Sequence, residues 1–120
     1  MKILYIEDNS ELREMITSLI TSESRSVTSC ATAEEADVLD KLNKYDVLIT
    51  DVSLPGMSGT DFAKNLLKAS PERVIILCSG YDLKNYPQQW GPNVYTIMKP
   101  FEIEELEELL NKIRKRENYK

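Results

Sequence analysis

The chain has 120 residues, of which 42% are hydrophobic, so it is long enough for one sizeable core and too short for two ordinary domains. We expect a single domain over residues 1–120. Its 20 Asp and Glu residues outnumber its 15 Lys and Arg residues, and the formal charge of −5 disfavours direct binding to nucleic acid. The basic residues over 112–116 fit the end of a helix, where positive charge complements the helix dipole.

Cysteine usage and hydropathy predict a cytoplasmic protein. Cys30 and Cys78 lie in strand-like segments without CxxC or Cys/His spacing, so we expect small buried hydrophobes in a reducing compartment. No apolar run approaches the ~18–20 residues that span a membrane, and the N-terminus lacks the pattern of a signal peptide. We therefore expect no membrane association.

The first half of the chain alternates strand and helix signals. Residues 1–6 form an apolar strand, and residues 10–22 carry the apolar spacing of an amphipathic helix. Residues 26–30 form a weak strand whose low apolar content suits a sheet edge. A capping box at residues 32–35 then starts a helix that ends at about Leu42.

In the second half, residues 46–50 and 74–78 form strands whose apolar runs, at 47–49 and 74–77, lack the polar alternation of half-exposed strands. They predict a parallel sheet that is covered on both faces. A helix lies between them, from Ser58 to Ser70, because the residue before Pro71 resists helical geometry.

The segment that follows the fourth strand is harder to assign. Pro87 falls within residues 82–90, where a fourth helix would lie, so we expect a short, kinked or irregular element there. Residues 94–98 form a fifth strand. The last helix has apolar residues on one face from Ile103 to Ile113, with acids in its first turns and bases in its last. The alternation predicts a doubly wound α/β fold.

Polar side chains follow four of the predicted strands. Glu7 and Asp8 end the first strand, Asp51 the third, Ser79 the fourth and Lys99 the fifth. If the strands are parallel, these ends meet at one sheet edge, where open α/β sheets bind ligands. A carboxylate beside a buried strand is costly unless something pairs with it, so the acids indicate a shared cation.

These residue types suit magnesium and phosphate chemistry. Mg²⁺ prefers oxygen ligands, and it would offset the mutual repulsion of the three acids as a phosphate dianion approaches. Lys99 adds a mobile positive charge and Ser79 a hydroxyl donor for the phosphoryl oxygens. Asp51 as nucleophile would form an acyl phosphate without a general base, which agrees with a chain that contains no histidine.

Each piece also has an ordinary interpretation. Glu7-Asp8-Asn9 is also typical of a helix start, where acids and Asn are favoured. Lys99-Pro100 is also typical of a turn, and Ser79-Gly80 of an ordinary loop. Their occurrence together, at four strand ends and in a complementary order, favours the metal and phosphate interpretation.

On these residues the chain resembles the receiver domains of two-component response regulators over essentially its full length. The matching motifs are Glu7-Asp8, Asp51 with Leu54-Pro55-Gly56-Met57-Ser58-Gly59 behind it, Ser79-Gly80 and Lys99-Pro100-Phe101. The resemblance implies a flavodoxin-like, three-layer α/β/α fold with a five-stranded parallel sheet in the order 2-1-3-4-5 and five helices. It also implies a cis Lys99-Pro100 bond.

The resemblance further implies that a histidine kinase or a histidine phosphotransfer protein phosphorylates Asp51. Mg²⁺ would be held by Asp8, Asp51 and the Ser53 backbone carbonyl, with Glu7 acting through water. The resulting conformational change would control a downstream protein or output domain, without direct binding of this domain to nucleic acid. Such a domain catalyses its own phosphorylation and slow dephosphorylation but is not a conventional turnover enzyme.

Two features depart from the family pattern. Thr96 stands where the family commonly has an aromatic side chain that swings inward, and Tyr95 is expected to face the other way. Segment 82–90 departs as well, so a homodimer formed through the usual fourth-helix surface is left open. We expect phosphorylation to reach the surface through residues 79–86, with Tyr81 as the side chain that responds.

Three other functions share part of this pattern. A flavodoxin shares the fold, but its first loop needs Ser or Thr and Gly to hold a phosphate. Glu7 and Asp8, which this chain has in that loop, would repel the phosphate without a cation. A haloacid-dehalogenase-type phosphatase has a second acid two residues after the nucleophile, where this chain has Ser53. A receiver-like module that binds partners without phosphorylation stays open as the alternative. Three contexts stay open: a stand-alone regulator, a fragment of a DNA-binding regulator and the receiver of a hybrid kinase.

Overall fold

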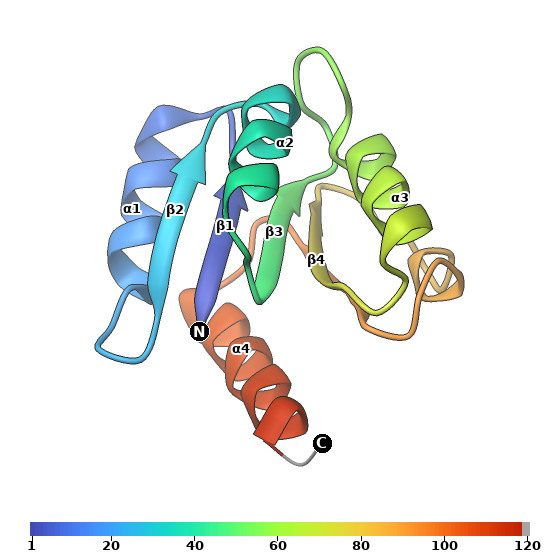
Figure 1. Ribbon diagram of the computed structural model, residues 1–120. Coiled ribbons are helices and arrows are strands. Elements are labelled where there is room, and N and C mark those ends of the chain that lie inside the picture. Colours follow the sequence, from blue (N-terminus) through green and yellow to red (C-terminus); the bar gives the residue numbers. More distant parts are fainter. Residues whose placement is uncertain (119–120) are drawn as a thin grey trace.

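The computed structural model describes residues 1–118, which fold around one five-stranded sheet (Figure 1). The strands, all paired in parallel in the order β2-β1-β3-β4-β5, are β1 (Lys2–Ile6), β2 (Ser26–Cys30), β3 (Val47–Asp51), β4 (Val74–Ser79) and β5 (Val94–Met98). The α-helices of this described part are α1 (Ser10–Ile20), α2 (Ala33–Leu42), α3 (Gly59–Ala69) and α4 (Ile103–Asn118). The predicted parallel, doubly wound, flavodoxin-like arrangement is confirmed.

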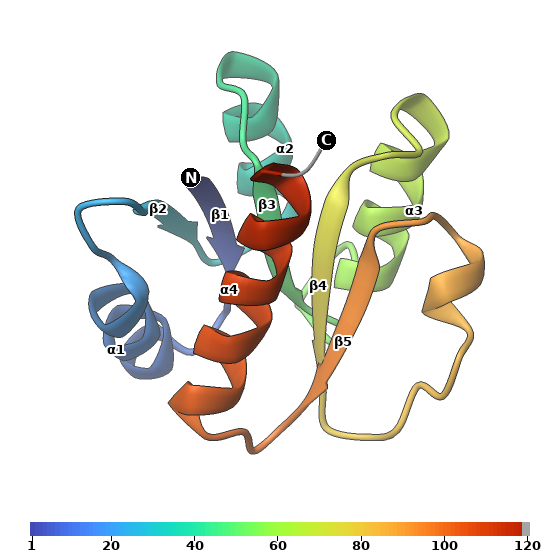
Figure 2. The same cartoon turned by 90° about the horizontal axis from the view of Figure 1, so that it is seen from below.

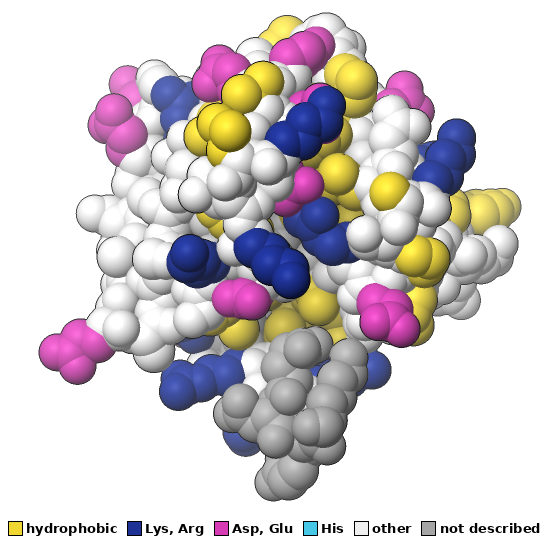
Figure 3. All heavy atoms as spheres, in the orientation of Figure 1, with side chains coloured by type: hydrophobic (Ala, Val, Ile, Leu, Met, Phe, Trp, Pro, Cys, Tyr) yellow, Lys and Arg dark blue, Asp and Glu magenta, His cyan; other side chains and the backbone are white. Residues whose placement is uncertain are grey.

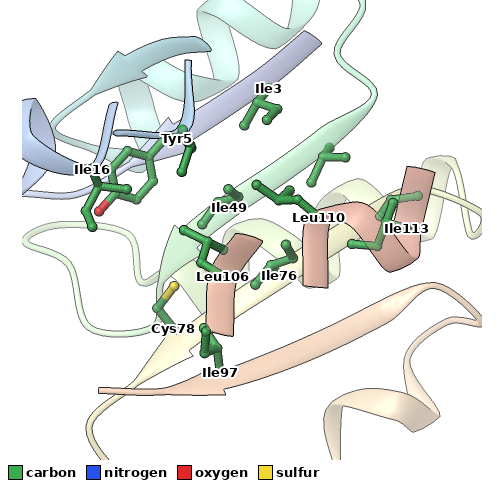
Figure 4. Close-up of a cluster of buried hydrophobic side chains, with 13 residues drawn as sticks. Ile3, Tyr5, Ile16, Ile49, Ile76, Cys78, Ile97, Leu106, Leu110 and Ile113 are labelled. Carbon is green, nitrogen blue, oxygen red and sulfur yellow. The ribbon is translucent and has the colours of Figure 1, made fainter. Parts of the chain in front are cut away.

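Helices cover both faces of the sheet, as the two views in Figures 1 and 2 show. Alternate strand residues point to opposite faces, so each strand contributes to two cores. One core lies under α1 and α4 and includes Ile49, Ile76 and Leu106 (Figure 4). The other lies under α2 and α3 and includes Leu48 and Phe62. Burial of each such side chain contributes about 1.5–3 kcal/mol.

Side-chain caps explain where three of the helices begin. The Asn9 side chain accepts a hydrogen bond from the Leu12 backbone N–H at 3.0 Å. The side chains of Thr32 and Ser58 each accept one from the backbone N–H three residues further along, at 3.1 Å and 3.0 Å. Each cap satisfies a backbone donor that the first helical turn leaves free. The predicted starts of α2 and α3 are therefore correct, whereas α1 ends at Ile20, two residues before its predicted end.

The expected count of five α-helices is wrong for the described residues. Between β4 and β5 they form a single 3-10 turn, η1 (Pro87–Gln89), with Pro87 at its start. Proline has no N–H to donate and blocks the preceding helical turn, so a full helix cannot run through this segment. Leu83 and Trp90 pack against the α2 and α3 core where a fourth helix would lie. The prediction of a short or irregular element was correct.

A buried arginine, not anticipated from the sequence, joins the start of β2 to the last helix. Arg25 is 7% exposed, and its guanidinium lies 2.7 Å from the Glu107 carboxylate and 3.0 Å from the Asn111 side-chain oxygen. A buried charge is tolerated only when it is paired in this way. The contact ties residues about 82 positions apart in the chain.

The two cysteines are free and buried, as predicted. Within residues 1–118, no helix combines the length and the apolar character needed to cross a membrane. On the face formed by α2 and α3, basic and acidic side chains are interspersed rather than separated into large patches (Figure 3).

Candidate functional site

The sheet brings the predicted acids together at the carboxyl ends of its central strands. Glu7 and Asp8 follow β1, and Asp51 is the last residue of β3, which is the neighbour of β1 in the sheet. One carboxylate oxygen from each of these three residues lies within 4.8 Å of the other two. Such a group of oxygens matches the ligands that Mg²⁺ prefers.

Lys99 reaches this cluster from the end of β5. Its Nζ lies 2.7 Å from Glu7 Oε1 and 3.1 Å from Asp51 Oδ2. Burial lowers the pKa of Lys99, but hydrogen bonds to the two carboxylates outweigh it, so the pKa is raised overall. The ammonium therefore stays charged. The Lys99-Pro100 bond is cis, as predicted.

Glu7 is the most deeply buried of the acids, at 2% exposure. Besides Lys99, its carboxylate accepts the Asn9 N–H at 3.1 Å, and its backbone carbonyl accepts a hydrogen bond from the Arg13 guanidinium at 2.7 Å. Arg13 was not predicted as a site residue. Its position in the second turn of α1 gave no signal, because only the folded chain places it beside the end of β1.

The backbone of Asp51 is held in place by Gly59 at the start of α3. A Cβ on Gly59 would lie 1.8 Å from the Asp51 carbonyl oxygen, so the close approach requires glycine. The Gly59 N–H donates to the Val52 carbonyl at 3.0 Å, and the Thr50 hydroxyl donates to the Asp51 carbonyl at 3.0 Å. The carboxylate of Asp51 is thus presented from a rigid support.

The side chains below the cluster are neutral. Burial raises the pKa of Cys78, the β4 neighbour of Asp51, to about 12. Burial, reinforced by Glu7, also raises the pKa of Tyr5. Both groups keep their protons at neutral pH and so add no charge beside the three acids and the single lysine of the cluster. This acidic excess suits a divalent cation.

The remaining two predicted site residues are placed differently. Ser53 is exposed in the loop that follows Asp51. Ser79 is buried at the end of β4, but its hydroxyl donates to the Tyr81 carbonyl at 2.7 Å and accepts the Tyr81 N–H at 3.1 Å. The hydroxyl proton is therefore engaged by the next loop rather than by the acidic cluster.

Two hollows adjoin the site. A cavity of about 40 Å³ is lined by residues that include Ser79, Tyr81 and Thr96. A larger groove of about 510 Å³ lies between α1 and the start of α4, where Lys99 and half-exposed Met15 contribute to its walls. Tyr95 faces away from Thr96, since it packs on the α1 and α4 core and its hydroxyl oxygen accepts a hydrogen bond from the Arg116 guanidinium.

Known proteins share both the sequence pattern and the fold. Residues 3–111 match the family model of the response regulator receiver domain. The cell cycle response regulator CtrA of Brucella ovis is 33% identical over 109 residues, as is CtrA of Brucella canis. These alignments cover 88% of this chain but 47% of each regulator, so the chain spans about half their length.

Solved structures give the same result. The receiver domain of the Francisella response regulator 1452 superposes with a TM-score of 0.83 at 25% identity, covering 96% of this chain and 97% of its own. The response regulator TrrA of Thermotoga maritima, solved in complex with Mg²⁺-BeF, gives 0.82 at 25%, covering 93% and 97%. The receiver of the hybrid histidine kinase CckA gives 0.78 at 26%, covering 94% and 98%. The chain belongs to the response regulator receiver domain family of two-component systems.

Proposed function

We propose that this receiver domain accepts a phosphoryl group on Asp51 in a Mg²⁺-dependent reaction and changes conformation to control a partner. The observation that carries the proposal is the cluster itself: three carboxylates within 4.8 Å of one another, with the Lys99 ammonium bridging two of them. The cluster combines a nucleophile, a set of oxygen ligands for a cation and a mobile positive charge.

Asp8, Asp51 and the Ser53 backbone carbonyl would hold the cation, and Glu7 would act through water. The donor set supports this, because it is all oxygen and carries excess negative charge. TrrA, which shares the fold, was solved with Mg²⁺-BeF. When bound, the cation neutralises charge on the phosphoryl oxygens and the carboxylates.

In the transfer step, an Asp51 carboxylate oxygen forms a bond to phosphorus as the P–N bond of a phosphohistidine breaks. The imidazole leaves with the electron pair and takes up a proton. Lys99 then exchanges part of its contact with Asp51 for a phosphoryl oxygen, and the Ser79 hydroxyl donates to another after it leaves Tyr81. No general base on this chain is required.

The donor would be a histidine kinase or a histidine phosphotransfer protein in the cytoplasm. Its histidine must reach Asp51, and the groove beside α1 shares Lys99 with the acidic cluster, which makes the groove a suitable surface for it. In this proposal, residues 1–120 form one receiver domain, which passes its signal to a downstream protein or output domain.

Incubation with acetyl phosphate and Mg²⁺, followed by intact-mass measurement, tests the proposal. The mass is expected to increase by one phosphoryl group, which hydroxylamine removes. EDTA in the reaction is expected to prevent the addition, because it binds the Mg²⁺. Asp51→Asn is expected to abolish it, because an amide is a poor nucleophile. Asp61→Asn, which alters an exposed acid of α3, is the control and is expected to react normally. Full labelling of Asp51→Asn would contradict the assignment.

One observation favours a second candidate, a module that binds partners without phosphorylation. The Ser79 hydroxyl is already committed to Tyr81, and position 96 lacks an aromatic side chain. This candidate predicts that partner binding is the same for wild type and Asp51→Asn, with or without acetyl phosphate.

A further inference from the structure

The loop after Asp51 is held by a side chain from another element, at a point two residues before α3 begins. Glu34, in the first turn of α2, accepts a hydrogen bond from the Met57 N–H through Oε2 at 3.1 Å. A helix start favours negative charge, so the carboxylate is well placed there. The contact bridges 23 positions of the sequence and joins α2 to the loop between β3 and α3.

Gly56 shows how closely the loop turns over this carboxylate. Its φ is +75°, a conformation that side-chain-bearing residues rarely adopt. A Cβ built on Gly56 would lie 2.6 Å from Glu34 Oε2 and 3.3 Å from Oε1. The glycine therefore serves two purposes, since it permits the turn and leaves room for the carboxylate beneath it.

The two ends of the same loop are fixed by the sheet and by α3. The Val52 N–H donates to the Cys78 carbonyl at 2.9 Å, and the Gly59 N–H donates to the Val52 carbonyl at 3.0 Å. Between these anchors, Ser53 and Gly56 are exposed, and the bond from Glu34 supplies a third point of attachment. Residues 53–58 thus lie between two fixed ends, and Glu34 adds a contact near the end that leads into α3.

We propose that Glu34 is a positioning residue of the phosphorylation site: it fixes residues 53–58 from α2 and thereby raises the affinity of the site for Mg²⁺. This inference rests on the proposed function, because it uses the Ser53 carbonyl as a metal ligand. Mg²⁺ demands near-ideal octahedral geometry, so a ligand on a mobile loop must be ordered when the cation binds. A loop that is ordered beforehand avoids that cost.

A Mg²⁺ titration followed by amide NMR shifts tests the inference on four proteins: wild type, Glu34→Ala, Glu34→Gln and Glu35→Ala. Glu34→Ala is expected to raise the Mg²⁺ dissociation constant by about 3- to 10-fold, the scale of one hydrogen bond. Glu34→Gln keeps an acceptor oxygen and is expected to restore most of the affinity. Glu35→Ala removes the same charge from the same helical turn and is expected to bind as wild type does.

Hydrogen exchange provides a second measurement. The Met57 amide is expected to exchange faster in Glu34→Ala than in wild type, while the Val52 amide stays protected. Gly56→Ala disturbs the same contact from the loop side and is expected to weaken Mg²⁺ binding as well. It replaces Glu34→Ala in the comparison if that variant folds poorly.

The outcomes separate the two proposals. Equal Mg²⁺ affinity in wild type, Glu34→Ala and Gly56→Ala would overturn the role of Glu34 while leaving the proposed function intact. Equal weakening by Glu34→Ala and Glu35→Ala would also overturn it, because the effect would then be one of charge alone. If wild type itself showed no Mg²⁺ response, the proposed function would fail, and the role of Glu34 with it.

Discussion

The loop after β3 and the segment after β4 leave neighbouring strands at the same edge of the sheet, yet they are held very differently. Residues 52–59 are bonded at both ends and, through the Met57 N–H, to the Glu34 carboxylate. Residues 80–93 contain one short 3-10 turn in place of a helix, and the side chains of Tyr81 and Tyr86 are 57% and 67% exposed. The loop after β3 is the more firmly held side of the site, and the segment after β4 is the more exposed and looser side.

This contrast matches two physical requirements. Phosphoryl chemistry needs ligands held in place before the reaction, whereas a signal needs two conformations that are close in free energy. Ser79 belongs to the second requirement, because its bonds to Tyr81 are ordinary hydrogen bonds with a net worth of about 0.5–1.5 kcal/mol each. A bond to a charged phosphoryl oxygen is roughly twice as strong and can replace them.

The largest expected effect comes from the rigid loop. Gly59→Ala places a methyl group against the Asp51 carbonyl, and we expect it to lower the free energy of unfolding by about 3 kcal/mol or more. Gly80→Ala is the matched control in the loose segment, since nothing lies within 4 Å of a Cβ at Gly80. Urea denaturation measures both. Similar losses at the two glycines would remove the distinction between the segments.

A smaller effect is expected at the contact between the acids and Lys99. Lys99→Met leaves the buried Glu7 carboxylate without its cation, and we expect a loss of about 2–3 kcal/mol, reduced from the fully buried case because Lys99 is partly exposed. Mg²⁺ supplies a replacement charge, so it is expected to raise the melting temperature of Lys99→Met more than that of wild type. An equal rise in both proteins would mean that lysine and cation do not share the same carboxylates.

The loose segment is expected to respond when a phosphoryl mimic binds. With beryllofluoride and Mg²⁺ added, the largest amide shifts outside the immediate ligands are expected over residues 79–86, because Ser79 must release Tyr81. Residues 54–58 are expected to shift less. The expectation fails if residues 79–86 stay still while Tyr95 and Thr96 move most.

The smallest expected effect is kinetic. Tyr81→Ala is expected to change the dephosphorylation rate by about threefold, or ~0.6 kcal/mol in activation free energy, because Tyr81 lines the cavity beside Ser79. Tyr95→Ala and Tyr86→Ala are the controls and are expected to change the rate less. Phosphate release after removal of excess donor gives the rates, and a larger change in Tyr95→Ala would assign the response to β5 instead.

The features predicted from the sequence are those that depend on adjacent residues. The strand signals predicted all five strands to within a residue at each end, and the charged residues after them predicted that Glu7, Asp8, Asp51 and Lys99 meet. These are local signals, since a strand end and a cap are defined by adjacent residues. Pro87 likewise showed that the fourth helix would be irregular.

Contacts between distant segments were not predictable in this way. Arg13 and Glu34 occupy ordinary helix positions and Arg25 directly precedes β2, and their partners become apparent only when the chain is folded. The orientation of the Ser79 hydroxyl is also a matter of rotamer and loop conformation. Neither the distant contacts nor this orientation can be inferred from the residue type at a single position.

The core under α1 and α4 has a consequence for the order in which the protein assembles during synthesis. It combines Ile3 from the first strand with Leu110 and Ile113 from the last helix (Figure 4). The ion pair of Arg25 with Glu107 likewise needs α4. The core under α2 and α3 draws on residues 4–94. A chain emerging from the ribosome can therefore close that face first, while the opposite face stays open to chaperones or to misassociation until α4 has been made.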